Sequence, residues 1–290
     1  MDVITFIQLL INGVLLGGLY MLFSTGLNLI YGVMRLVNYA HGEFLMMSMF
    51  ILYWTYYLWH IDPYGFLPVT SLIMFILGYV LYWTLLRRIV RLPYPAQIMT
   101  FVGTIFILQN LALWLWGADY RSPHIPYVYK PLTIGSIYIP LGRALTLLLG
   151  ILIYTSLHLF LHKTTLGVFI RAVSQDRGAA TMIGINVDKV TAITVGISLA
   201  LAGATAALIL PIYYVYPYVG SDFTIIGFII ITLGGLGNML GALLASLLIG
   251  ILISFAGYLY SVQIAYALAL MVYIAVLMLR PQGLLGGKKH

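Results

Sequence analysis

"VITFIQLLINGVLLGGLYMLFSTGLNLIYGVM", Val3–Met34, contains no Asp, Glu, Lys or Arg. An uninterrupted run of about 18 or more apolar residues is long enough to cross the hydrocarbon core of a bilayer. As one helix rising about 1.5 Å per residue, this run would extend about 48 Å, whereas the core is about 30 Å thick. We therefore expect a membrane-spanning helix that tilts, or that breaks near Gly17-Gly18 or Gly26.

The rest of the chain repeats this pattern. Hydrophobic residues make up 62% of the 290 residues and charged residues only 7%, which leaves too little polar surface for a water-soluble globule. The absence of cysteine excludes thiol chemistry and disulfides. Met1-Asp2 lacks the basic segment of a cleavable signal, so the first run is expected to stay as a span. The other charge-free runs are Phe44–Ile61, Pro63–Leu86, Leu92–Ala118, Ala144–His162, Val190–Ser221 and Phe223–Leu279.

Basic residues group in alternate connections between these runs. Because positively charged connections are retained in the cytoplasm, these connections are expected to face inward. The net charge of +7 then reflects membrane orientation rather than nucleic-acid binding. Eleven of the 14 Lys and Arg belong to this group: Arg35, Arg87, Arg88, Arg91, Lys163, Arg171, Arg177, Lys189, Arg280, Lys288 and Lys289.

The number of crossings follows from the same charges. Lys189 and Arg280 are both expected in the cytoplasm, so the chain must cross the membrane an even number of times between them. Val190–Ser221 supplies one of these crossings. Phe223–Leu279 therefore supplies three crossings, or one crossing and a re-entrant pair that breaks at Gly234–Gly237. We predict an all-α, polytopic bundle of about 8–10 spans, nine by this count, with the N-terminus outside and the C-terminus in the cytoplasm. Residues 1–290 are expected to form a single transmembrane domain.

"FIRAVSQDRGAATMIGINVDK", Phe169–Lys189, is unlike the runs around it. The segment 163–189 carries six charged residues and is expected to be a cytoplasmic loop with a short helix. An early Asp176 and a late Gly184 match the preferences of helix ends. By i, i+3, i+4 spacing, one face of this helix would carry Asp176, Ala179, Ala180 and Ile183. Two interpretations stay open, namely a helix resting on lipid headgroups and a helix presented to a soluble partner.

The apolar spans hold few groups that carry chemistry. No Asp, Glu, Lys or Arg lies inside a predicted span, so an intramembrane relay driven by protons or sodium is not indicated. The nearest candidate is Glu43, at the cytoplasmic start of the second span. His41 and Glu43 diverge on a helix and do not form a zinc motif. No G-x-x-x-x-G-K-[ST] motif is present, so the chain is not itself an ATPase.

Small residues are regularly spaced in "GGLGNMLGALLASLLIG", Gly234–Gly250. This spacing allows close approach of helix backbones, and a bend at Gly234–Gly237 that lines a pathway is the alternative. In Gly234–Gly250, one helix face carries Gly237, Gly241 and Ala245, and an adjacent face carries Ala242, Ser246 and Gly250.

The segments Pro211–Asp222 and Asp119–Arg143, which are expected to face outward, are rich in Tyr and Pro. This composition fits an interfacial aromatic belt or a docking surface for an external protein.

Four blocks of sequence together resemble the permeases of branched-chain amino-acid ABC importers, and most closely the shorter of the two paired permeases. The blocks are "GLNLIYGVMRLVNYAHGEFLMM", "GVFIRAVSQDRGAATMIGINVDKV", "LGGLGNMLGALLASLLIG" and "LRPQGLLG", in order between Leu10 and Gly286. The resemblance implies an importer in the cytoplasmic membrane of a prokaryote, with a second permease subunit, two cytoplasmic ATPases and an external solute-binding protein. It also implies that ATP and Mg are bound by the ATPases, and that this chain binds no cofactor and catalyses nothing.

The resemblance further implies that the loop 163–189 couples the permease to the ATPase. Departures from the family pattern are Gln175, where an acidic residue is common, and Gly178, which weakens a helix by about 1 kcal/mol relative to Ala. The residues expected to take part in this coupling are Arg171, Ala172, Asp176, Arg177, Ala179, Ala180, Met182, Ile183 and Gly184.

The sequence thus predicts a permease subunit that moves leucine, isoleucine, valine or a similar small neutral amino acid inward, driven by partner ATPases. An importer of urea or short amides is the alternative within the family, and a passive channel is the alternative from another class. An intramembrane hydrolase built on Ser198 is disfavoured, because a Ser in a membrane helix usually bonds backbone or a neighbouring helix. The translocation path is expected to involve Asn28, Asn38, His41, Glu43, Gly234, Gly235, Gly237 and Asn238.

Overall fold

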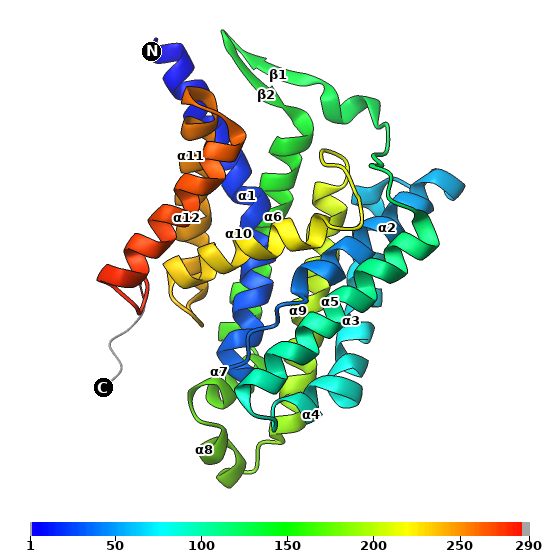
Figure 1. Ribbon diagram of the computed structural model, residues 1–290, viewed down its shortest axis with the longest axis vertical. Coiled ribbons are helices and arrows are strands. Elements are labelled where there is room, and N and C mark those ends of the chain that lie inside the picture. Colours follow the sequence, from blue (N-terminus) through cyan, green and yellow to red (C-terminus); the bar gives the residue numbers. More distant parts are fainter. Residues whose placement is uncertain (1, 286–290) are drawn as a thin grey trace.

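In the computed structural model, which describes residues 2–285, the chain folds almost entirely into helices (Figure 1). The helical elements are α1 (Val3–Met34), α2 (His41–Trp59), α3 (Pro63–Leu81), the π-helical turn η1 (Tyr82–Leu86), α4 (Arg87–Ile89), α5 (Tyr94–Trp116), the 3-10 turn η2 (Pro126–Tyr129), α6 (Leu141–Lys163), α7 (Thr165–Gln175), α8 (Arg177–Met182), α9 (Val187–Ile209), α10 (Val219–Gly234), α11 (Met239–Leu259) and α12 (Val262–Leu279).

Seven helical segments of the described chain are long and apolar enough to cross a membrane. They are α1, the continuous segment formed by α3, η1 and α4, and then α5, α6, α9, α11 and α12. α10 is apolar but shorter, with 16 residues. The protein is therefore a polytopic helical membrane protein, as the charge-free runs predict.

α1 is one continuous helix, and it passes through Gly17, Gly18 and Gly26 without a break. Two of its glycines instead allow α11 to approach closely. A Cβ added to Gly13 would lie 2.6 Å from the Cα of Ile251, and one added to Gly17 would lie 2.8 Å from the Cα of Leu247. Backbone contact of this kind is typical of helix packing in lipid. The hydrophobic effect does not drive helices together there, and small residues allow close van der Waals packing instead.

The prediction of an all-α chain is wrong in one place, because the connection between α5 and α6 contains a β-hairpin. Its strands, β1 (Pro131–Ile134) and β2 (Ile137–Pro140), pair antiparallel. Gly135, at φ +60°, supplies the left-handed residue that a two-residue turn needs. The side chain of Gln8 on α1 fixes the hairpin, donating to the Tyr138 carbonyl at 2.8 Å and accepting from the Tyr138 amide at 2.9 Å.

α1 and α9 run through the middle of the bundle (Figure 1). Nearly all side chains of α9 are buried, and α3 packs along it. A Cβ added to Gly78 of α3 would lie 2.8 Å from the Val195 carbonyl oxygen of α9. By contrast, α5 and α12 are mostly exposed on the periphery. The small residues of α9, chiefly Ala, Gly and Thr, therefore let it occupy the crowded centre.

The long charge-free run Phe223–Leu279 is divided among three helices, the first of which, α10, already begins at Val219. α10 ends at Gly234 and α11 begins at Met239, which confirms the predicted break in the Gly-rich stretch. Gly235 and Gly237 have φ angles of +101° and +85°, conformations that residues with a Cβ rarely adopt. In Figure 1, α10 lies across the bundle, steeply inclined to α1 and α11.

Candidate functional site

The residues expected to form the path fall into two groups, the first of which surrounds the α10–α11 turn. Asn28 is 1% exposed and lies on α1 opposite this turn. Its side-chain amide donates to the Asn238 carbonyl at 2.8 Å and its oxygen accepts from the Gly237 amide at 2.6 Å. The Asn238 side chain caps α11 by accepting from the Gly241 amide at 3.0 Å. The two asparagines thus satisfy backbone groups that the turn would otherwise bury unpaired.

The second group surrounds Glu43, which is 1% exposed in the first turn of α2. Its Oε1 accepts from the Gln109 amide of α5 and from the Ser221 hydroxyl of α10, each at 3.0 Å. Gln109 also donates to the Ser221 oxygen at 2.9 Å. No basic side chain among the described residues pairs with Glu43. The carboxylate therefore joins three helices through neutral donors.

α2 and α10 begin against one another beside this cluster. The Gly42 amide donates to the Thr224 hydroxyl at 3.1 Å. A Cβ added to Gly42 would lie 1.9 Å from the Gly220 carbonyl oxygen, and one added to Gly220 would lie 2.5 Å from that of Gly42. Only glycine at both positions allows the two helix starts to meet at backbone distance.

His41 and Asn38, also expected in the path, have local roles. His41 is fully buried, with its ring centroid 5.1 Å from that of Phe23. Its ring nitrogens have no hydrogen-bond partner within residues 2–285, so no described bond connects it with Glu43. Asn38 accepts from the Ala40 amide at 3.1 Å and shapes the turn that precedes α2. The structure does not assemble His41 and Glu43 into a proton relay.

The loop 163–189 contains two short helices rather than one. The Thr164 hydroxyl caps α7, accepting from the Gly167 amide at 3.0 Å. Asp176 ends α7 in an extended conformation and caps α8, accepting from the amides of Gly178 at 2.7 Å and Ala179 at 3.0 Å. Asp176 and Gly184, which the sequence placed near the two ends of a helix, therefore lie at the two ends of α8. Asp176 caps its start, and Gly184 follows its end at φ +84°.

The break at Asp176 changes which side chains the loop presents. Ala180 is 2% exposed and belongs to a buried cluster with Ile170, Val173 and Val190, so it does not lie on one open face with Asp176, Ala179 and Ile183. Met182 and Ile183 are 89% and 74% exposed. Ala180 therefore holds α8 against the permease. Of the residues expected to couple, those on the open surface of α8 and the turn after it are Asp176, Ala179, Met182, Ile183 and Gly184. Of the other residues expected to couple, Arg171 is exposed, and Ala172 and Arg177 are partly buried.

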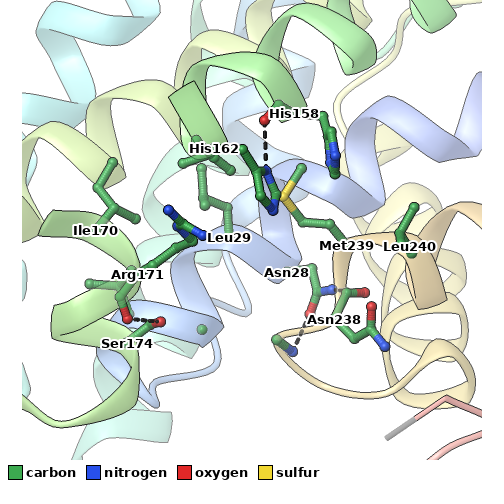
Figure 2. Close-up of a pocket in the computed structure, with 14 residues that line it drawn as sticks. Asn28, Leu29, His158, His162, Ile170, Arg171, Ser174, Asn238, Met239 and Leu240 are labelled. Atoms are coloured by element: carbon green, nitrogen blue, oxygen red, sulfur yellow. Dashed lines mark hydrogen bonds between the residues drawn. The ribbon is translucent and has the colours of Figure 1, made fainter. Parts of the chain in front are cut away.

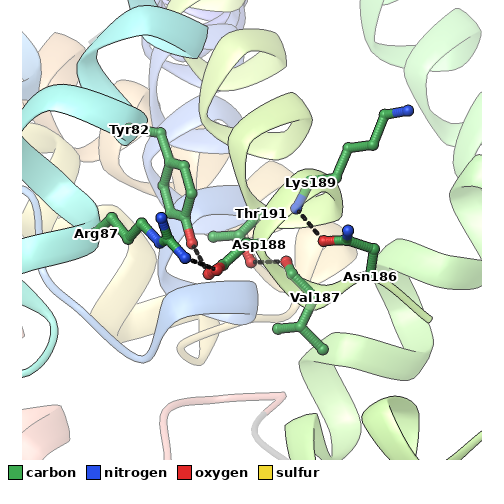
Figure 3. A network of polar contacts seen from close by, with 7 residues as sticks. All are labelled: Tyr82, Arg87, Asn186, Val187, Asp188, Lys189 and Thr191. Atoms are coloured by element: carbon green, nitrogen blue, oxygen red, sulfur yellow. Dashed lines mark hydrogen bonds and ion pairs between the residues drawn. The ribbon is translucent and has the colours of Figure 1, made fainter. Parts of the chain in front are cut away.

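The end of the loop is tied to the end of the α3 segment (Figure 3). Asp188, in the first turn of α9, accepts from the Tyr82 hydroxyl at 2.7 Å and pairs with the Arg87 guanidinium at 2.7 Å. Asn186 caps α9 by accepting from the Lys189 amide at 3.0 Å. At the other side of the loop, the Arg35 guanidinium donates to the Ser174 carbonyl at 3.2 Å. These contacts attach the loop to the bundle at two points.

The two Tyr-rich connections that the sequence predicts to be outside are also tied together. Arg121 and Val215 exchange backbone hydrogen bonds of 2.9 and 2.8 Å, so the two Tyr-rich segments lie side by side. Tyr127 donates to the Asp62 carboxylate. Burial raises the pKa of the Tyr127 hydroxyl, and the hydrogen bond and charge of Asp62 raise it further. Tyr127 therefore stays a neutral donor at any physiological pH.

Sequence reasoning missed Gln109, Ser221, Tyr82 and Gly220. Gln109 had a signal of its own, because a lone Gln inside an apolar span is costly unless it is bonded within the protein. Ser221 and Gly220 had no such signal, since they are far from Glu43 in the chain and only the fold brings them together. Tyr82 is one of 23 tyrosines and did not stand out.

Comparison with known proteins agrees with this architecture. A family model described as "Branched-chain amino acid transport system / permease component" matches residues 9–279. The permease protein BraD of a Pseudomonas aeruginosa high-affinity branched-chain amino acid transport system is 28% identical, over 98% of this chain and 97% of its own length. LivH, the corresponding permease protein of Escherichia coli K12, is 26% identical, over 97% and 96%. A probable LivH of Methanocaldococcus jannaschii is 25% identical, over 96% and 92%.

No solved structure matches the chain at a significant level. The family match nevertheless covers nearly every helix described above, from within α1 to the end of α12. The chain belongs to the permease components of branched-chain amino acid transport systems.

Proposed function

We propose that this chain is a permease subunit of an ATP-driven importer that moves branched-chain or similar small neutral amino acids into the cytoplasm. The observation that carries the proposal is the family match over residues 9–279, in a chain without a nucleotide-binding motif. Without such a motif, the chain depends on partner subunits for the energy of uphill transport. Its partners would be a second permease subunit, two cytoplasmic ATPases that bind ATP and Mg, and an external solute-binding protein, in the cytoplasmic membrane of a prokaryote.

The proposed orientation places α7 and α8 in the cytoplasm and the β-hairpin outside. The nine passes would then be the seven long segments, α2, and the inclined α10 together with the connections at its two ends. This arrangement is supported by the basic residues Arg35, Arg87, Arg88 and Arg91, which fall at the same end of the bundle as the loop 163–189. Lys288 and Lys289, which also enter the charge argument, lie outside the described residues.

For the path, we retain the residues expected from the sequence and give them different roles. The hydrogen bonds of Glu43 with Gln109 and Ser221 would hold α2, α5 and α10 together in one conformation of the permease. These bonds would break in another conformation of the transport cycle. Asn28 and Asn238 would keep the turn Gly234–Gly237 on α1 while α10 moves. Asn38 and His41 shape the start of α2, and Gly235 gives the turn its backbone freedom.

For coupling, the exposed tip formed by Met182 and Ile183 would contact the ATPase. Two attachments of the loop support this proposal, namely Asp188 with Arg87 and Tyr82, and Arg35 with Ser174. A displacement of the tip would pass through these contacts to α3, α9 and α1. The passive channel is disfavoured, because a channel has no need of such a loop.

The test is uptake by vesicles that contain the chain with its paired permease, ATPases and binding protein. We expect labelled leucine to accumulate only with ATP inside the vesicles, and dissipation of the pH gradient to leave the rate unchanged. Uptake that needs the gradient despite ATP would disprove ATP-driven transport. Equilibration of leucine without ATP would identify a channel, and ATP-driven accumulation of urea but not leucine would favour the amide importer.

A further inference from the structure

A cavity of about 350 Å³ lies between α1, α6, α7 and the start of α11 (Figure 2). One wall is basic and polar, with His158 and His162 of α6 and Arg171 of α7. The facing wall is largely apolar and includes Leu29 and Met239. No Asp or Glu of the described part of the chain lines the cavity.

The polar wall has a buried polar atom without a partner. The imidazole rings of His158 and His162 lie with centroids 4.1 Å apart and are tilted by 31°, and His162 Nδ1 lies 2.8 Å from the His158 carbonyl oxygen. The Nδ1 of His158 is buried without a hydrogen-bond partner within residues 2–285. In the same part of the chain, Arg171 forms no ion pair with a carboxylate. Figure 2 shows its guanidinium directed towards His162.

A second cavity of about 310 Å³ continues the first and shares Gly32, Ser174, Gly237 and Asn238 with it. It adds Arg35, whose guanidinium donates to the Ser174 carbonyl. Among residues 2–285, no carboxylate lines this cavity either. The guanidinium groups of Arg171 and Arg35 therefore both lie near Ser174, where the described lining carries no negative charge.

The position of α7 indicates the depth of these cavities. α7 begins directly after α6, and Leu166, Val168 and Phe169 on its surface are 38%, 48% and 39% exposed. A helix that combines exposed apolar side chains with a basic residue is typical of the membrane interface. In the orientation proposed above, on which this inference rests, the cavities lie at the headgroup level of the cytoplasmic leaflet.

We propose that this region binds the phosphate group of an acidic phospholipid. Guanidinium groups match phosphate oxygens in geometry and charge, and basic pockets between membrane helices on the cytoplasmic side are suited to such headgroups. The apolar wall accepts the glycerol backbone and the first methylenes of the acyl chains. The exposed Ile151, Leu152 and Leu159 of α6 continue this surface towards the bilayer centre.

A zwitterionic amino acid fits the same region less well. Its carboxylate would find donors, but its ammonium group would find no carboxylate among the lining residues. Burying an unpaired charge is unfavourable. The absence of acidic residues thus favours the lipid over the transported substrate.

The experiment measures lipid binding to the full chain, with the subunits that co-purify, by native mass spectrometry. Phosphatidylglycerol and phosphatidylcholine with identical acyl chains are titrated separately. We expect preferential binding of phosphatidylglycerol, and a reduction of about fivefold in its affinity in Arg171→Gln, as expected for one basic residue at a membrane surface. The matched control is Lys163→Gln, which removes an exposed charge at the end of α6 outside both cavities and should keep the wild-type affinity.

Several outcomes would overturn the proposal. Equal losses in the two variants would mean general attraction to a basic surface. Displacement of the lipid by equimolar glycerol phosphate would identify a site for a soluble anion, and displacement by leucine would identify a substrate site. Because binding is measured without ATP or transport, a negative result would leave the proposed transport function standing, and failure of transport would leave the lipid site testable.

Discussion

At the scale of single residues, Glu43 shows how this protein keeps an acid inside a membrane bundle. A carboxyl group buried without a basic partner is unfavourable unless hydrogen bonds stabilise it. Gln109 and Ser221 provide such bonds to Oε1 from two other helices, whereas Oε2 is buried without a hydrogen-bond partner within residues 2–285. The sequence revealed Glu43, because an acid near an apolar run is conspicuous. It did not reveal the partners, which are separated from Glu43 by 66 and 178 positions.

Replacing Gln109 with Leu should therefore destabilise the protein. The change leaves Glu43 with one donor fewer, and an unsatisfied buried polar group costs about 1–3 kcal/mol. The melting temperature in detergent, followed by fluorescence-detected gel filtration, should fall by several degrees. The matched control is Asn110→Leu, because Asn110 is exposed and bonds only the Phe106 carbonyl of its own helix. An equal fall in both variants would contradict the stabilising role of the Glu43 cluster.

At the scale of elements, contacts between helices depend on glycines whose partners the sequence did not identify. Small residues at every fourth position of α11 predicted close packing, and the structure confirms it. The partner of Gly250 is α1, where a Cβ on Gly250 would lie 2.3 Å from the Gly17 amide nitrogen. Gly241 instead meets Gly234, with its added Cβ 2.0 Å from that carbonyl oxygen. A periodic pattern shows which face is small, but not which helix lies against it.

Replacement of two glycines of α11 by Ala should have opposite effects on the stability of the protein. At Gly250 the new methyl group meets backbone atoms that cannot rotate away, so α1 and α11 must separate. Gly250→Ala should lower the melting temperature and the yield of folded protein. At Gly257 nothing lies within 4 Å of an added Cβ, and Ala is favoured over Gly in a helix by about 1 kcal/mol. Gly257→Ala should be neutral or stabilising, and the reverse order would refute the packing described for α11.

The loop between α6 and α9 is the element for which sequence reasoning was least accurate. The pattern predicted one helix with Ala180 on the same face as Asp176, Ala179 and Ile183. Asp176 instead separates two helices, and Ala180 packs on α7 and α9. The i, i+3, i+4 rule identifies neighbours on a helix but not which side is covered by the rest of the chain.

Ile183→Glu tests the exposed tip of this loop. A carboxylate in an apolar contact with the ATPase would be buried unpaired, at a cost of several kcal/mol. We expect loss of uptake and of stimulated ATPase activity at normal membrane abundance. Ile183→Leu, which keeps the side chain apolar, should retain both activities. Normal uptake by the Glu variant would exclude the tip from the coupling contact.

At the scale of the whole molecule, the spans were predictable and their tilts were not. Hydropathy is a local property, so the charge-free runs locate the long helices directly. The charges on either side of Phe223–Leu279 predicted an odd number of crossings but not where one helix ends and the next begins. The inclination of α10 depends instead on the meeting of Gly42 with Gly220, which is a tertiary contact. The β-hairpin was missed because its strands are only four residues long.

The absence of cysteine allows the proposed orientation to be tested with single introduced thiols. Gln175 and Tyr129 are both exposed, in the loop 163–189 and in the connection that precedes the hairpin. A membrane-impermeant maleimide added to intact cells should label Tyr129→Cys, and should label Gln175→Cys only after the membrane is opened. Labelling of Gln175→Cys in intact cells would reverse the proposed orientation.

The meeting of α2 with α10 also has an electrostatic consequence. Each helix start carries a partial positive charge of roughly half a unit, because its first amides point outward along the dipole. Two such starts converge at Gly42 and Gly220, and the Glu43 carboxylate lies beside both. In its ionised form, the Glu43 side chain would act as a counter-ion to both helix starts. A movement that separates α2 from α10 would then leave one of these positive helix starts without that counter-ion.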